Sequence, residues 1–361
     1  MIDFKAPLFA DWDLHSYRLV AEASPHFSKD VSPPFAYRIL GPYVVGLLPL
    51  PDPLAFRLVN SIACVALVVL FYRFLMDRGI QSRVAFFTAL LFACNRYFFG
   101  QFAWNPFQID DVLALLCFVL SFTLMFKRRW FLFACCFALG SLTREVVMIL
   151  IPVSFAYLWE EGTLRIEYKK WLLAITPAIA VFLLVRIFLF SDNVRMGIAG
   201  ILPYYWMKFG ESIGNALTAS AWFRRLIWST LPVTLLPFIF WKSTVSFFAR
   251  RKYLFLFLVL VIITDLWGID PGGGDAERQM APSFLALYWL IAELSQHEFA
   301  HVKWALPSIL AGGYLGSLHH LQGIYPLPNR AYTLLAVVVA CVEISAIALY
   351  VKHKSAASRA L

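Results

Sequence analysis

The chain has 361 residues, of which 61% are hydrophobic and only 15% are charged. A soluble domain of this length carries about 25% charged residues, so the composition excludes an ordinary soluble protein and predicts an integral membrane protein. The formal net charge of +9 is typical of basic cytoplasmic loops that face anionic lipid, and no nucleic-acid partner is expected.

Apolar runs along the chain predict an all-α transmembrane bundle of about 10–11 membrane helices, since a helix needs about 20 apolar residues to cross the bilayer. The two short runs between residues 130 and 159 indicate either a tight hairpin or one bent element. The expected spans are 54–75, 84–100, 109–126, 130–143, 146–159, 171–190, 226–247, 253–267, 281–295, 304–318 and 331–350.

The whole chain, 1–361, is expected to be a single membrane domain, with no cleaved signal peptide and no internal repeat. Residues 1–53 are predicted to form an external acidic loop that ends in a short interfacial helix at 37–50. A second external segment, 191–225, is rich in tyrosine and tryptophan, a composition typical of the headgroup level. All six cysteines lie in apolar runs without a CxxC pair, which gives no sign of a disulfide framework or a cysteine zinc site.

The charges of alternate loops predict the orientation of the chain. One set of loops holds most of the lysines and arginines and should be cytoplasmic, whereas the other holds most of the aspartates. The N-terminus is therefore expected outside and the C-terminus inside, in a bacterial-type inner or plasma membrane. The basic set comprises Arg73, Arg78, Arg83, Lys127, Arg128, Arg129, Arg165, Lys169, Lys170, Lys242, Arg250, Arg251, Lys252, Lys303, Lys352, Lys354 and Arg359.

Five groups of ionisable residues are predicted to share the outer face, and ionisable residues at membrane depth mark a functional site by default. Arginine presents a fork of donors that matches phosphate oxygens, and a carboxylate can accept the proton of an attacking hydroxyl. The pattern favours transfer of a sugar from a polyprenyl phosphate carrier. The groups are Asp11 with Asp13; Arg38; Asp110 with Asp111; Arg144 with Glu145; and Asp275, Glu277 and Arg278.

Four stretches, "DWDLHSY", "PFAYRILGP", "LTREVV" and "ERQMAP", together resemble the GT-C superfamily of multi-pass membrane glycosyltransferases. The most similar members are bacterial and have an Asp-x-x-x-Tyr element followed by a Tyr-x-Arg-x-Leu-x-Pro-like element. Members usually have a membrane helix before the acidic loop, whereas twelve residues precede Asp13 here. The matching positions are Asp13, Tyr17, Tyr37, Arg38, Leu40, Pro42, Arg144, Glu145, Arg278 and Pro282.

The resemblance implies a GT-C-like fold and a polyprenyl-phosphate-linked sugar as donor, with a glycan, lipid or protein as acceptor. Asp13 would be the catalytic base, paired with Asp11 in a DxD-like element, and direct displacement would invert the anomeric centre. Arg38, Arg144 and Arg278 would hold the donor phosphate. The remaining candidates for substrate binding are Tyr17, Tyr37, Asp110, Asp111, Glu145, Asp275 and Glu277.

Three features of the sequence allow more than one interpretation. Asp110 and Asp111 are equally well explained as helix-capping acids, because carboxylates at the start of a helix complement its dipole. A Mg²⁺ or Mn²⁺ ion could be held by Asp11 with Asp13 or by Asp110 with Asp111, although a phosphate held by arginines requires none. Arg186 is expected to extend along its helix towards the interface rather than bind phosphate.

Two other classes of protein are alternatives. "HEFAH", residues 297–301, fits the H-E-x-x-H zinc-protease pattern, but it is predicted in a short cytoplasmic loop with no third ligand nearby. A transporter or lipid flippase would be expected to have inverted repeats and broken helices that meet at the midplane; the charged groups gather at one surface instead.

Overall fold

The computed structural model describes residues 14–28, 30–31, 35–95, 98, 105–190, 206–207, 210, 235–268, 280–299, 302–317 and 329–357. These residues form helices, turns and short connections with no strand among them, which confirms the prediction of an all-α protein. Five of the predicted site residues lie outside the described part of the chain, as does most of the aromatic connector 191–225. They are Asp11, Asp13, Asp275, Glu277 and Arg278.

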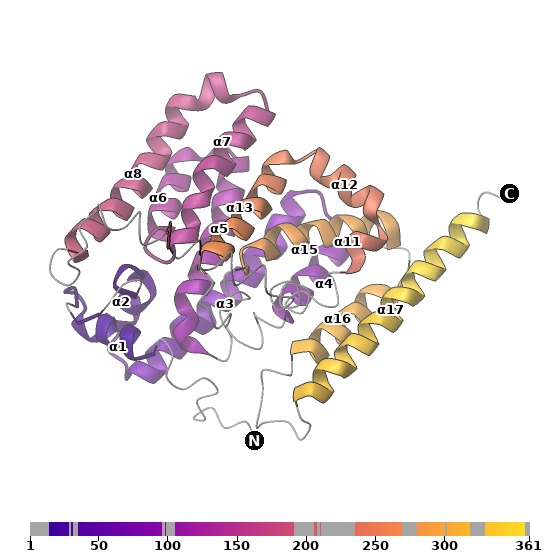
Figure 1. Ribbon diagram of the computed structural model, residues 1–361, viewed down its shortest axis with the longest axis horizontal. Coiled ribbons are helices and arrows are strands. Elements are labelled where there is room, and N and C mark those ends of the chain that lie inside the picture. The colour runs from indigo at the N-terminus through magenta and orange to yellow at the C-terminus, as the bar shows by residue number, and fades with distance from the viewer. Residues whose placement is uncertain are drawn as a thin grey trace.

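The first half of the chain begins with short elements and continues into longer helices (Figure 1). Proline and aspartate open the first long helix, a common arrangement since proline needs no backbone donor in the first turn and the acid complements the helix dipole. The elements are α1 (Leu14–Ala23), η1 (Phe35–Tyr37), α2 (Leu40–Gly46), α3 (Asp52–Asp77), α4 (Ser82–Ala93), η3 (Pro106–Gln108), α5 (Ile109–Phe126), α6 (Trp130–Gly140), η4 (Glu145–Ile149), α7 (Leu150–Glu160) and α8 (Leu164–Phe190).

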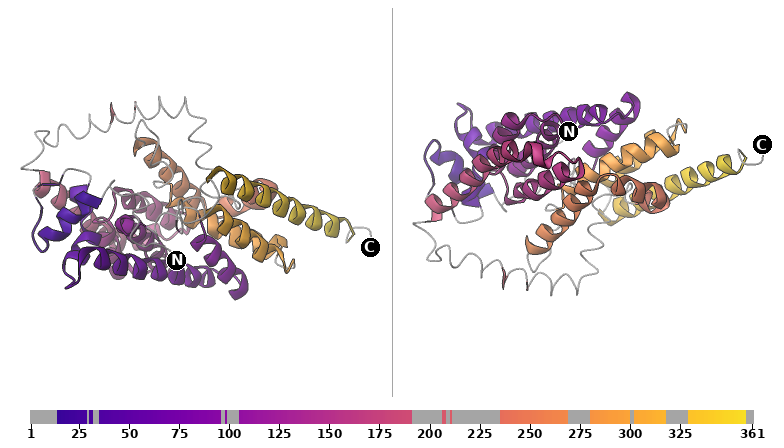
Figure 2. Two further views of the ribbon diagram at one scale, coloured as in Figure 1. Left: turned by 90° about the horizontal axis from the view of Figure 1, so that it is seen from below. Right: turned by 90° about the horizontal axis from the view of Figure 1, so that it is seen from above.

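The second half contributes helices that pack on the first. Helices α16 and α17 lie side by side at one end of the long axis, and α1 and α2 lie at the other (Figures 1 and 2). The elements are α11 (Leu236–Ile239), α12 (Trp241–Ala249), α13 (Lys252–Gly268), α15 (Ser283–Leu294), the π-helix η6 (Ser295–Phe299), α16 (Ala305–Ser317) and α17 (Asn329–Ala357).

In the part of the chain that the structure describes, three helices are long and apolar enough to cross a membrane: Asp52–Asp77, Pro106–Phe126 and Leu164–Arg186. The first and third also expose large hydrophobic side chains, such as Ile62 and Leu173, which are 60% and 74% exposed. Apolar surface of this extent is costly in water but suits contact with lipid tails. The length and surface of these helices therefore support an integral membrane protein.

Several predicted spans differ in detail from the helices. The expected helix at 84–100 ends at Ala93, and the one at 171–190 starts earlier, at Leu164. The predicted continuous span 226–247 is wrong within its described part, because α11 ends at Ile239 and α12 begins at Trp241. Pro237 lies in the first turn of α11, and its carbonyl accepts a hydrogen bond from Thr244 Oγ1 at 3.0 Å, which holds the break.

The core between the helices is strongly aromatic. Phe126 on α5 lies within 6.1 Å, centroid to centroid, of rings on α3, α7, α13 and α15. Tyr288 of α15 is buried and accepts a hydrogen bond from Asn95 Nδ2 at 2.9 Å. Aromatic pairs of this kind add about 0.5–1.5 kcal/mol each beyond their buried area, so they fix the spacing of helices that lipid alone would not hold together.

The contact between α1 and α2 depends on a glycine. A Cβ placed on Gly46, the last residue of α2, would lie 2.1 Å from the carbonyl oxygen of Ala21 and 2.8 Å from Cβ of Ser24. The backbone of α1 can approach α2 this closely only because residue 46 has no side chain.

We therefore expect Gly46→Ala to destabilise the protein by about 1–3 kcal/mol, the usual cost of an overpacked contact. The free energy of unfolding in detergent, measured by urea titration, tests this. Gly210→Ala is the control, because a Cβ at Gly210 meets no atom of the described residues within 4 Å; equal losses in both variants would contradict the packing argument.

Candidate functional site

The candidate site is built on the turn at 141–144 between α6 and η4, which shows that the pair of short runs at 130–159 forms two helices rather than one bent element. Thr143 closes the turn by donating from its hydroxyl to the carbonyl of Gly140 at 2.6 Å. A Cβ on Gly140 would lie 2.9 Å from Val147, so glycine lets α6 end against η4. Arg144 is extended (φ −147°, ψ 147°), so Arg144 and Glu145 follow the turn directly.

Residues 39–41 dock on this turn and on the start of α5. The backbone N–H groups of Ile39 and Leu40 donate to the carbonyl of Leu142 at 2.9 and 3.2 Å. The N–H of Gly41 donates to Asp110 Oδ1 at 3.0 Å. A Cβ on Gly41 would meet that same oxygen at 2.9 Å, so the glycine of "YRILGP" is needed for the close approach of α2 to the buried carboxylate.

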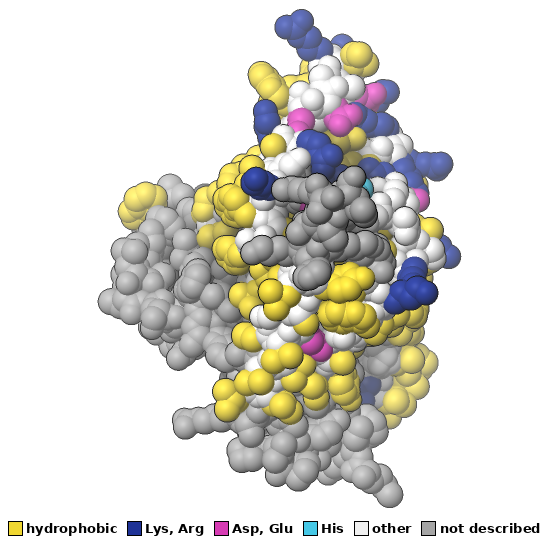
Figure 3. Space-filling model, turned by 90° about the vertical axis from the view of Figure 1, so that its right-hand side faces the viewer, with side chains coloured by type: hydrophobic (Ala, Val, Ile, Leu, Met, Phe, Trp, Pro, Cys, Tyr) yellow, Lys and Arg dark blue, Asp and Glu magenta, His cyan; other side chains and the backbone are white. Residues whose placement is uncertain are grey.

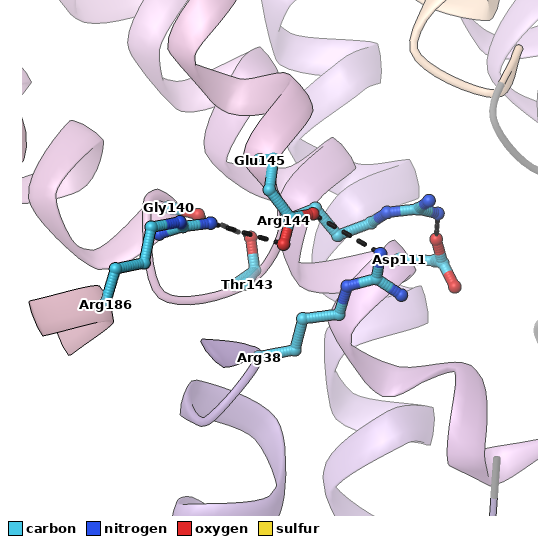
Figure 4. Close-up of polar contacts among 7 residues, drawn as sticks. All are labelled: Arg38, Asp111, Gly140, Thr143, Arg144, Glu145 and Arg186. Atoms are coloured by element: carbon cyan, nitrogen blue, oxygen red, sulfur yellow. Dashed lines mark hydrogen bonds and ion pairs between the residues drawn. The ribbon is translucent and has the colours of Figure 1, made fainter. Parts of the chain in front are cut away.

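Glu145 accepts from two arginines that come from different parts of the chain (Figure 4). Arg38 Nη2 lies 3.3 Å from Oε2, and Arg186 Nη2 lies 3.2 Å from Oε1. Both guanidinium groups are largely buried, at 11% and 13% exposure, whereas the Glu145 side chain is 29% exposed. One carboxylate thus joins the end of η1, the start of η4 and the last turns of α8.

Arg186 is the residue that sequence reasoning misjudged. It does not extend towards the interface as expected but turns into the cluster, where its guanidinium carbon lies 4.7 Å from the ring centroid of Tyr37 and 3.4 Å from that of Phe182. The signal that could have found it is an isolated cation near the end of an otherwise apolar run, which by itself suggests an ionic partner.

A second ion pair joins Arg144 to Asp111 in the first turn of α5. Both side chains are nearly buried, with exposures of 9% and 6%. Asp110 is buried as well, and its Oδ2 has no hydrogen-bond partner in the described part of the chain. Both aspartates lie in the first turn of α5, where they complement the helix dipole, and both also contact other segments of the protein.

These contacts fit a divalent metal poorly at Asp110 and Asp111. Asp111 is paired with Arg144, one oxygen of Asp110 is bonded to Gly41, and neighbouring helix residues point about 100° apart. No group of three potential metal ligands occurs within the described residues.

Tyr17 and Tyr37 pack beside the segment that carries Arg38. Both are buried, and the ring of Tyr17 packs edge-on against Phe35, with centroids 5.6 Å apart. Helix α1 begins at Leu14, directly after Asp13, and contacts both α2 and η1. The part of the "DWDLHSY" stretch that lies in α1 is therefore packed against the segment that carries Arg38.

A separate layer of polar residues lies at the C-terminal ends of α3, α5 and α7, away from Glu145. Lys127 pairs with Asp77, and Glu160 accepts from the backbone N–H groups of Lys252 and Tyr253 at 3.2 Å each. Lysine and arginine side chains gather at the top of the face in Figure 3, with mostly hydrophobic side chains on the described surface below. Helix α5 has 18 residues and so separates its two ends by about 26 Å.

The H-E-x-x-H motif lies at this second layer. The segment 295–299 is a π-helix that continues α15, not the loop that was predicted. His297 Nε2 lies 3.3 Å from Glu293, and Glu298 accepts a hydrogen bond from Ser243. His301 is outside the described residues.

Comparison of the chain with protein-family models, with curated proteins and with solved structures finds no match in any of the three. The chemistry of the site must therefore be argued from its own residues.

The electrostatics of Glu145 make a pH-dependent contribution to stability. Burial acts to raise the pKa of its carboxyl, but the guanidinium groups of Arg38 and Arg186 outweigh burial and hold the pKa below its ordinary value of 4.5. A depressed pKa in the folded state means that the stabilisation is complete above about pH 5 and is lost as the pH falls through the folded-state pKa.

We expect the difference in melting temperature between the wild-type protein and Glu145→Gln to be largest near pH 7 and to shrink below about pH 4. Thermal unfolding in detergent across this range measures it. The control is Glu22→Gln, which removes an exposed carboxylate of α1 that makes no ion pair among the described residues. A difference that is independent of pH would contradict the assigned ionic role of Glu145.

Proposed function

We propose that the chain is a GT-C-like membrane glycosyltransferase that moves a sugar from a polyprenyl-phosphate carrier to an acceptor on the extracytoplasmic side. The observation that carries the proposal is the cluster at one end of the apolar helices, where Arg38 and Arg186 converge on one carboxylate, Glu145. These three side chains have a net formal charge of +1. A sugar–phosphate–lipid diester carries one negative charge, so its phosphate matches this cluster.

The position of the cluster in the fold also favours a lipid-linked substrate. It lies at the ends of α5 and α8, two helices long and apolar enough to cross a membrane. A carrier that enters from the bilayer presents its phosphate at such a depth, beside the guanidinium groups. Preorganised cations in a partly buried site stabilise charge that develops on a leaving group more strongly than they would in water.

In the proposed reaction, Asp13 takes the proton of the acceptor hydroxyl, with Asp11 beside it. The acceptor oxygen forms a bond to the anomeric carbon while the bond from that carbon to the phosphate oxygen breaks. The electron pair of the broken bond stays on the phosphate, and Arg38, Arg186 and Arg278 bind the resulting dianion. Arg144, a phosphate ligand by the resemblance alone, stays paired with Asp111. Attack from the side opposite the leaving group inverts the anomeric centre.

The orientation belongs to the same proposal. The basic layer around Lys127, Arg251 and Lys252 would face the cytoplasm, in agreement with the positive-inside rule. The cluster around Glu145 would then face outwards, with the N-terminus outside and the C-terminus inside. The GT-C-like arrangement of 10–11 membrane helices is proposed together with this orientation.

We expect Asp13→Asn to abolish sugar transfer without loss of folded protein, because an amide cannot accept the acceptor's proton. Mass spectrometry of glycolipids and surface polysaccharide, in cells with the wild-type chain, the variant or neither, measures transfer. A lipid-linked monosaccharide should accumulate in cells with the variant and in cells with neither chain. Retained activity in the variant would remove the assigned base.

The metalloprotease alternative is tested by metal analysis of the purified protein. Stoichiometric zinc that is lost in His297→Ala would favour a metalloprotease instead.

We expect Arg38→Gln to weaken binding of a short-chain polyprenyl phosphate about tenfold or more, since a charge-assisted contact contributes about 1.5–3 kcal/mol. Arg38→Lys should lose part of this affinity, because lysine keeps the charge but lacks the planar fork. Quenching of tryptophan fluorescence in lipid nanodiscs measures binding. Arg165→Gln, an exposed arginine of α8 at the basic end, is the matched control; equal affinity of the Arg38 and Arg165 variants would refute the assigned phosphate contact.

A further inference from the structure

A charged groove lies at the basic end of the protein, between α12 and the α15–η6 segment. It has a volume of about 330 Å³. Lys242, Ser246 and Arg250 follow one another at intervals of four residues and so line one side of α12. Glu293 and His297 line the opposite side, on the α15–η6 segment.

The cations of α12 are available in this groove. Lys242 and Arg250 are exposed, and neither forms an ion pair within the described residues. The acid of the groove is already neutralised, because Glu293 is paired with Arg251 and lies 3.3 Å from His297 Nε2. The groove therefore has an excess of positive charge.

Arg251 is held in place and does not compete for a ligand. Its guanidinium carbon lies 4.4 Å from the ring centroid of Phe247 and 4.9 Å from that of Trp289, in addition to its pair with Glu293. Both aromatic rings belong to buried side chains. Arg251 is thus held by Glu293 and the two rings, and the free cations Lys242 and Arg250 line the exposed part of the groove.

The floor of the groove is apolar, formed by Phe247, Leu290 and Leu294. Trp241, next to Lys242 in the sequence, is 60% exposed, and exposed tryptophan is typical of the interfacial depth of a bilayer. A cationic rim over an apolar floor matches a molecule with an anionic phosphate and acyl chains. Inorganic phosphate has no apolar part and would make no favourable contact with the apolar floor.

From these observations we propose that the groove between α12 and α15–η6 binds the phosphate headgroup of an anionic phospholipid. Lys242 and Arg250 contact the phosphate oxygens, Ser246 donates a hydrogen bond, and the first acyl carbons lie on Phe247 and Leu294. The site is at the opposite end of the helices from Glu145, so it stands whether or not the chain transfers sugars. Under the proposed orientation, its lipid comes from the cytoplasmic leaflet.

The test compares short-chain phosphatidylglycerol with phosphatidylcholine of the same chain length, added to the full chain in uncharged detergent. Native mass spectrometry counts bound lipid, and thermal shift titration gives the apparent affinity. We expect phosphatidylglycerol to bind in preference to phosphatidylcholine. The double variant Lys242→Gln/Arg250→Gln should lose about tenfold in apparent affinity for it, because two charge-assisted contacts are removed.

The control Arg165→Gln/Lys169→Gln removes two exposed cations of α8 at the same end of the protein and should leave affinity unchanged. Ser246→Leu fills the groove without changing its charge and should weaken binding as well. Equal loss in the groove and control variants, or equal binding of phosphatidylcholine, would overturn the proposal. Equal stabilisation by inorganic phosphate would overturn the assignment to a lipid.

Discussion

One shared carboxylate fixes the geometry of the polar end of this protein. Glu145 lies 107 residues after Arg38 and 41 residues before Arg186 in the sequence, yet it bonds to both. In a membrane protein, association of helices gains little from the hydrophobic effect, because lipid tails are as apolar as leucine. Directional ionic contacts of this kind must therefore select which helix ends meet. Without Glu145, two largely buried guanidinium groups would face each other, which is costly at low dielectric.

The helices could be predicted from the sequence because the bilayer imposes a simple rule on it. Long apolar runs predicted α3 and α5 to within two residues, and α8 except for its first two turns. The break at Phe240 was missed because residues 235–241 are apolar on both sides of it, and hydropathy does not distinguish one helix from two. Only the contact from Thr244 to the carbonyl of Pro237 reveals why the chain turns there.

The members of the charged cluster could also be found from the sequence, but their pairing could not. Arg38, Asp110 and Glu145 are conspicuous because ionisable residues are rare in an apolar chain. Their partners depend on how α6, α7 and α8 pack around α5, and no local pattern encodes that arrangement. Arg186 was misassigned for this reason: whether an arginine near a helix end reaches out to the interface or inwards depends on the neighbouring helices. Asp11, Asp13 and Arg278 keep the roles that the resemblance suggests as predictions.

The two acids of the cluster that form ion pairs, Glu145 and Asp111, differ in a way that suggests a division of roles. The pair of Arg144 and Asp111 is almost fully buried, so it suits a structural role in which α5 is fixed to the turn at 141–144. The contacts of Glu145 measure 3.2 and 3.3 Å, longer than the 2.7–2.9 Å of a tight charge-assisted bond, and Glu145 is the more exposed acid. Under the proposed function, a phosphate oxygen could replace Glu145 at Arg38 and Arg186 while the buried pair stays in place. The site would then bind its donor by exchanging one anion for another, without moving a helix.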